Sequence, residues 1–78
     1  MKKQEFISLL KSALEFDKVD LSESTVLKEI PSFDSMSVMG IIAFVDEHFS
    51  KRITAQQLNS ISTLRSLMEL IGMDNFSD

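Results

Sequence analysis

Several residue types that catalytic and metal-binding proteins use are missing or scarce in this chain of 78 residues. It has no cysteine, which excludes disulfides, thiolate nucleophiles and cysteine-ligated metals. His48 is the single histidine, so zinc sites built from several histidines are excluded too. The two glycines, Gly40 and Gly72, stand alone and form no glycine-rich loop to hold a phosphate. We therefore predict no metal site and no self-contained active site.

Long apolar runs and basic stretches are also missing. No segment approaches the roughly 20 apolar residues that a membrane-spanning helix needs. Glu5, Ser8 and Lys11 interrupt the segment that would be apolar in a signal peptide. The net charge is -4 and no basic stripe is interleaved with aromatic residues, which disfavours nucleic acid as a partner. We expect a cytoplasmic monomer that neither inserts into a membrane nor binds nucleic acid.

The chain does contain enough apolar residues for one modest core, since 44% of its residues are hydrophobic and 26% are charged. A chain of this length is predicted to form a single domain over residues 1–78. A domain this small buries only about 60% of the surface of its unfolded state, which leaves little room for an internal catalytic cavity.

Apolar residues recur at helical spacing near the start of the chain and then lose their period. A first helix is predicted over residues 3–16. From Asp17 to Phe33, turn-forming residues mix with apolar ones, which predicts a long first loop. Within that loop, Leu27 and Ile30 are one turn apart, so we expect a short helical turn before Pro31.

The helices of the second half are marked by their N-terminal residues. A second helix is predicted to begin at Asp34 or Ser35 and to continue to about Phe49. Thr54 begins a capping box and predicts a short third helix. Thr63 is the predicted N-cap of the last helix.

Gly72 stands where a left-handed residue commonly ends a helix, and residues 73–78 are expected to fray. The predicted fold is all-α: a small four-helix bundle with three main helices, one short helix and a long first loop. The residues expected to face its core are Phe6, Leu9, Leu10, Ala13 and Leu14 in the first helix, Val38, Ile41, Ile42, Val45 and Phe49 in the second, and Leu64, Leu67, Met68 and Ile71 in the last.

Ser35 is the serine whose position suggests chemistry. A hydroxyl at a helix start lies beside unsatisfied backbone N–H groups, which would favour a phosphate ester there. A simpler interpretation is that Ser35, or Asp34, only caps the helix. His48 follows 13 residues later, roughly 20 Å away along one helix, so it cannot serve as a base for Ser35. We interpret His48 as a solvated residue near a helix C-terminus.

The segment Phe33-Asp34-Ser35-Met36 resembles the Asp-Ser-Leu phosphopantetheine attachment motif of acyl carrier proteins, with Met36 where leucine is usual. The resemblance covers about residues 3–72. It includes the amphipathic first helix, the long loop and the position of the motif at the start of the second helix. Ile53-Thr54 is similar to the family's Ile-Pro step before the short third helix.

The resemblance implies that Ser35 is the residue esterified by 4′-phosphopantetheine. A separate phosphopantetheinyl transferase would donate this arm from coenzyme A and would recognise Asp34 and Met36. The arm ends in a thiol that holds an acyl group as a thioester, so the chain needs no cysteine of its own. Acyl-transferring or acyl-modifying enzymes would be the other partners. In this family acyl chains can enter the bundle, and the lining residues would then be Ile53, Ile61 and Leu67, each of which also fits a plain core role.

The second helix departs from the fatty-acid carriers of this family, whose second helix is usually rich in acidic residues. Here its first half is uncharged, which favours a specialised pathway, fatty-acid or polyketide-like, and docking by apolar contact. The alternative is that these apolar residues pack on the preceding loop. Gly40 lies inside this helix, where glycine costs roughly 1 kcal/mol of stability relative to alanine. Close approach of another segment to the helix would explain why glycine occupies the position. The predicted docking residues are Met36, Met39, Gly40, Ala43, Asp46 and Glu47.

Three hypotheses remain. The first is an acyl carrier that holds its cargo on Ser35 and presents it to partner enzymes. The second is an aminoacyl or peptidyl carrier, because such domains also have less acidic docking helices. The third is an unmodified helical adaptor that binds a partner through the apolar face of the second helix. None of the three is an enzyme.

Overall fold

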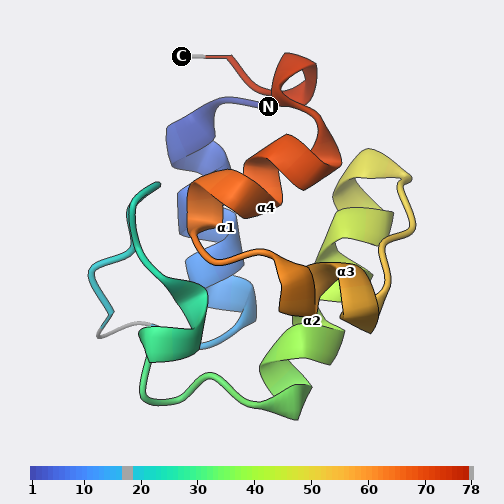
Figure 1. Cartoon of the computed structure of the whole chain (residues 1–78). Helices are drawn as coiled ribbons and strands as arrows, with labels where there is room; N and C mark the ends of the chain where they lie inside the picture. The colour runs from blue at the N-terminus through green and yellow to red at the C-terminus, as the bar shows by residue number, and fades with distance from the viewer. Residues whose placement is uncertain (17–18, 78) are drawn as a thin grey trace.

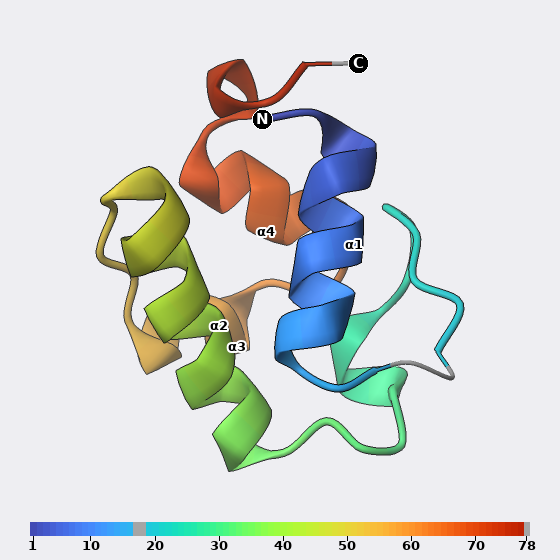
Figure 2. The same ribbon diagram turned by 180° about the vertical axis from the view of Figure 1, so that it is seen from behind.

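The computed structural model describes residues 1–16 and 19–77. In this part of the chain, α1 and α2 stand side by side, and α4 lies across them on one face (Figures 1 and 2). The predicted all-α bundle with a long first loop is confirmed. The elements, in chain order, are α1 (Lys3–Ala13), the 3-10 helix η1 (Leu27–Glu29), α2 (Ser35–Phe49), α3 (Ala55–Ser60), α4 (Leu64–Ile71) and the 3-10 helix η2 (Met73–Asn75).

The last two α-helices follow the sequence prediction closely. Thr54 accepts the Gln57 N–H at its hydroxyl, and the Gln57 side chain accepts the Thr54 N–H in return, so the capping box is formed. Thr63 caps α4 through the N–H of Ser66. The whole predicted apolar face of α4 is buried, and its members are Leu64, Leu67, Met68 and Ile71.

The predicted core faces of α1 and α2 are partly wrong. Leu9 is 37% exposed, while Ile7, on the other side of the stripe, is buried. In α2, Phe44 is buried, whereas Phe49 is only partly so. Of the other expected core residues, Ala13 is exposed, and Leu14, Val38 and Ile42 are partly buried. The buried faces of α1 and α2 are therefore rotated from the faces that helical spacing alone selects.

The first helix ends earlier than predicted, at Ala13. Glu15 adopts a left-handed backbone conformation, with φ at 59°, and this breaks the helical path. The N–H of Phe16 then donates to the carbonyl oxygen of Lys11 at 2.9 Å. This turn brings Phe16 into the core, where it is buried although it lies outside the helix.

The long first loop is packed by its own apolar side chains. Leu21, Leu27 and Ile30 are buried, and η1 is the short helical turn that was predicted before Pro31. Residues 17 and 18, at the start of the predicted loop, lie outside the described residues.

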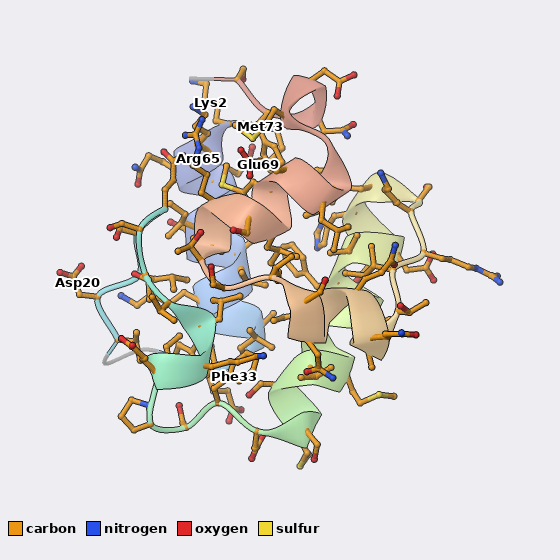
Figure 3. The ribbon with its side chains drawn as sticks, in the orientation of Figure 1. Lys2, Asp20, Phe33, Arg65, Glu69 and Met73 are labelled. Atoms are coloured by element: carbon orange, nitrogen blue, oxygen red, sulfur yellow. The ribbon has the colours of Figure 1, made fainter. Side chains whose placement is uncertain are left out.

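The loop is also tied to the linker between α3 and α4. Val26 and Thr63 form an antiparallel bridge. The N–H of Leu27 donates to the carbonyl oxygen of Ser62 at 2.9 Å. Arg65 adds a side-chain tether, with Nη1 3.1 Å from Oε1 of Glu23 on the loop, and its Nε is 3.7 Å from Oε2 of Glu69 on α4 (Figure 3). These bonds fix η1, and with it the segment that leads into α2.

The C-terminal segment does not fray as predicted, at least through residue 77; residue 78 lies outside the described residues. Gly72 ends α4 with a positive φ of 116°, as expected, but its ψ of 114° differs from that of a left-handed cap. Ser77 forms a parallel bridge with Lys2 beside α1. The ring of Phe76 lies 5.0 Å from that of Phe6. Aromatic packing and backbone hydrogen bonds therefore hold the two ends of the described chain together, and Figure 1 shows the N-terminus beside the C-terminal segment.

Candidate functional site

The start of α2 is held by a reciprocal capping box. The Asp34 carboxylate accepts the N–H of Ser37 at 3.0 Å, and the N–H of Asp34 donates to the Ser37 hydroxyl at 3.4 Å. Ser37 is only 7% exposed, and its hydroxyl also lies 3.4 Å from the carbonyl oxygen of Ser32. Asp34 is thus the N-cap, and the interpretation of Ser35 as the cap is wrong.

Ser35 is left as the first residue of α2, with its side chain exposed. Within the described ranges its hydroxyl has no hydrogen-bond partner. The backbone N–H groups of the first helical turn and the positive end of the helix dipole lie beside it. The hydroxyl is therefore accessible, at a helix end whose dipole attracts an anion.

Two grooves flank this helix start, and Asp34 lines both. We call them the α1 groove, with a volume of about 440 Å³, and the α3 groove, with a volume of about 490 Å³. The α1 groove is lined by Ala13, Leu14, Glu15, Ser32, Asp34, Met36, Ser37 and Gly40. The α3 groove is lined by Lys28, Phe33, Asp34, Ser35, Val38, Met39, Ala55 and Asn59.

The α3 groove is the one that Ser35 itself lines. Phe33, labelled in Figure 3 between η1 and the start of α2, contributes apolar surface together with residues of α2 and α3. At the rim, Nζ of Lys28 donates to the carbonyl oxygen of Asn59 at 2.8 Å, which ties η1 to the end of α3. A flexible group attached to Ser35 would have a mostly apolar surface to lie against.

The residues that sequence reasoning offered as cargo lining do not line either groove. Ile53 and Leu67 are buried in the core, and Ile61 is partly buried against it. The simpler of the two interpretations, a plain core role, fits all three.

Gly40 is explained by contact within the chain. A Cβ atom at this position would lie 2.7 Å from Cδ2 of Leu14, which is closer than carbon atoms pack. The close approach expected from sequence therefore comes from the end of the first helical segment. The contact leaves Gly40 half-buried against Leu14, in the wall of the α1 groove.

The remaining predicted docking residues lie on the outer face of α2. Met36 is 80% exposed, Met39 is 65% exposed, and Ala43 is exposed as well. The alternative that these three pack on the preceding loop is thus wrong. Asp46 and Glu47 are exposed further along the helix, and neither forms an ion pair within residues 1–16 and 19–77. The face is apolar near Ser35 and acidic toward the C-terminal end.

No acid–base machinery surrounds Ser35 in the described part of the chain. His48 lies at the far end of α2, exposed, with its ring 4.3 Å from that of Phe44. The described residues contain no cluster of three or more histidine, aspartate or glutamate side chains that could hold a metal ion.

Sequence reasoning missed two features of the site. The first is the buried role of Ser37, although its spacing of three residues from Asp34 is that of a capping box and could have been recognised. The second is the contact of Lys28 with Asn59. These residues are 31 positions apart, so no local pattern signals it.

Comparison with known protein families gives a match that covers most of the chain. The family model described as a phosphopantetheine attachment site matches residues 4–71, which include Ser35 and run from the first turn of α1 to the end of α4. Searches of curated proteins and of solved structures gave no significant match. No helix in the described ranges is long and apolar enough to cross a membrane.

Proposed function

The chain belongs to the phosphopantetheine attachment site family, and from this premise we propose that Ser35 carries the 4′-phosphopantetheine arm. Members of this family bind the arm covalently and work as carriers with partner enzymes. The observation that supports Ser35 most directly is its hydroxyl, exposed at the first residue of α2 while Asp34 provides the cap. A phosphopantetheinyl transferase could reach this oxygen without unfolding the start of α2.

The chain's own residues would assist the arm in two ways. The N-terminal end of α2 offers partial positive charge to the phosphodiester. The apolar wall of the α3 groove, formed in part by Phe33, Val38 and Met39, offers a surface to the arm's hydrocarbon portion. Because the reactive thiol arrives with the arm, the lack of cysteine is compatible with this role.

The carrier is proposed to hold an acyl group as a thioester and to serve a specialised, fatty-acid or polyketide-like pathway. Supporting this is the outer face of α2, where Met36, Met39 and Ala43 stand exposed and uncharged. The proposal includes recognition of Asp34 and Met36 by a phosphopantetheinyl transferase, a monomeric state, a cytoplasmic location and no catalytic activity of its own. An aminoacyl or peptidyl carrier is the second candidate, since the same uncharged face is compatible with it.

The test of this function is incubation of the purified chain with coenzyme A and a broad-specificity phosphopantetheinyl transferase. A carrier gains the mass of one arm, whereas an unmodified adaptor gains none with any of several transferases. The mass of the thioester-linked group on chain isolated from cells then separates an acyl from an aminoacyl cargo.

Partner docking gives a further prediction. Ala43→Glu is expected to weaken binding of the cognate partner, because the new carboxylate displaces apolar contact and is desolvated without a partner of its own. The same change is expected to improve recognition by ordinary fatty-acid-synthesis enzymes, whose docking patches are basic in the family that this chain resembles. Binding of the wild-type chain to its cognate partner should depend only weakly on salt, since few charges lie near Ser35.

The measurement is the dissociation constant at two salt concentrations. Gln4→Glu is the matched control, because it adds the same charge at an exposed position near the N-terminal end of α1. That end of α1 lies away from the start of α2 (Figure 1). A steep salt dependence for the wild type, or equal effects of Ala43→Glu and Gln4→Glu, would remove the apolar face of α2 from the docking surface.

A further inference from the structure

The chain has five methionines, and their exposure differs widely. Met36 is 80% exposed and Met39 is 65% exposed, while Met68 in α4 is fully buried. The two exposed ones stand one and four residues after Ser35 in α2. Met36 lines the α1 groove and Met39 lines the α3 groove, so each groove beside the attachment serine has one accessible thioether in its wall.

Exposed methionines react with peroxide. The sulfur lone pair attacks one oxygen of hydrogen peroxide, a sulfur–oxygen bond forms as the O–O bond breaks, and the proton on the attacked oxygen passes to the departing hydroxide, which leaves as water. The sulfur loses two electrons and hydrogen peroxide gains them. The product, methionine sulfoxide, is polar and chiral, and methionine sulfoxide reductases convert it back.

We infer that Met36 and Met39 are a reversible oxidation site that switches off loading of Ser35 and partner docking. This inference rests on the proposed carrier function and concerns the regulation of the same site. The oxidant is hydrogen peroxide or another hydroperoxide, and the restoring activity is that of a methionine sulfoxide reductase.

The position of each side chain explains the effect of oxidation. Met36 is adjacent to Ser35 on the surface that a transferase must contact, and a sulfoxide there replaces an apolar contact with a polar group that the enzyme must desolvate. Met39 contributes to the apolar wall of the α3 groove together with Phe33, Val38 and Ala55, and a sulfoxide there places a polar group in that wall. Oxidation therefore alters both grooves at once.

The fold is expected to tolerate this chemistry. Met36 and Met39 add little to the core, because most of their surface is already in water. Met68, whose oxidation would disrupt the core, is shielded in the folded chain. Mild oxidation is therefore expected to convert Met36 and Met39 to sulfoxides while the core around Met68 stays intact.

The test has two readouts on the same samples. The purified apo chain is treated with hydrogen peroxide, and peptide mass mapping follows the sulfoxide at each methionine. Met36 and Met39 are expected to oxidise at least about tenfold faster than Met68. The transferase reaction with coenzyme A is then timed, and loading of the oxidised chain is expected to slow by about tenfold or more, and to recover after treatment with the A and B types of methionine sulfoxide reductase.

The double variant Met36→Leu, Met39→Leu is the matched control, and its treated sample is compared with its own untreated sample. Its loading rate is expected not to change with peroxide. Oxidation of Met68 at the same rate as Met36, unchanged loading after oxidation, or an equal loss in the leucine variant would each overturn the switch. If the untreated wild-type chain is not loaded by any transferase, the carrier function itself fails, and the switch fails with it.

Discussion

Phe6→Ala is expected to leave much of the chain unfolded at room temperature. Phe6 is fully buried in α1, and its ring meets three others at centroid distances of 5.8 Å to Phe44, 6.0 Å to Phe49 and 5.0 Å to Phe76. Deleting a buried aromatic ring typically costs about 3–5 kcal/mol. A domain this small has a total stability near the lower end of the usual range of about 5–15 kcal/mol, so the loss removes most of it.

The measurement is urea denaturation followed by circular dichroism, with Phe49→Ala as the comparison. Phe49 was expected in the core from helical spacing, but it is only partly buried, so its removal should cost clearly less than removal of Phe6. If the two variants unfold at the same midpoint concentration of urea, the aromatic cluster is not centred on Phe6.

The ring of Phe76 in that cluster illustrates what the sequence does not disclose. Fraying of residues 73–78 was predicted because the segment follows the expected helix end at Gly72. The segment is held instead by contacts with residues about 70 positions away, such as the bond from the N–H of Lys3 to the carbonyl oxygen of Ser77. Pairings across that separation depend on the finished fold and leave no local signal.

Local sequence patterns were sufficient to predict features that depend on a single helix. The capping box at Thr54 and the single apolar face of α4 were both predicted correctly, because each depends on residues within two turns of one another. In α1, by contrast, local spacing was not sufficient: Leu9 was predicted to be buried, but Ile7 is buried in its place. Both residues flank the same stripe, and only the position of the neighbouring segments selects between them.

The candidate site divides in the same way. Asp34 and Ser35 were marked by their motif and by the helix start, and Met36, Met39 and Ala43 were marked by an apolar strip that one helix face could not bury. The grooves themselves require α1, η1 and α3 to be placed around the start of α2. Gly40 is required because the side chain of Leu14 occupies the space that a Cβ atom would need, and this contact could not be predicted from the sequence.

Ser35→Ala is expected to abolish phosphopantetheine loading while the helical content and the melting temperature stay close to those of the wild type. The hydroxyl supplies the oxygen of the ester and alanine has none. Stability is retained because the side chain is exposed, has no hydrogen-bond partner within the described residues, and is replaced by the residue with the highest helix propensity.

Ser37→Ala provides the control with the opposite pattern. It removes the hydroxyl that completes the capping box with Asp34, so it should destabilise the chain by about 0.5–2 kcal/mol. Loading of Ser35 should nevertheless continue, since the attachment oxygen is intact. Loss of loading in Ser37→Ala at a temperature where the chain is folded would show that the wrong serine has been assigned.

The most direct test of the account is to locate the arm on the wild-type chain. After incubation with coenzyme A and a transferase, the intact mass gives the number of arms, and fragmentation of the peptide that contains residues 32–37 gives the position. Residues 32–37 include three serines, Ser32, Ser35 and Ser37, so the spectrum must distinguish among them. The account predicts one arm, on Ser35. An arm on any other serine, or an unmodified chain with several transferases, would contradict it.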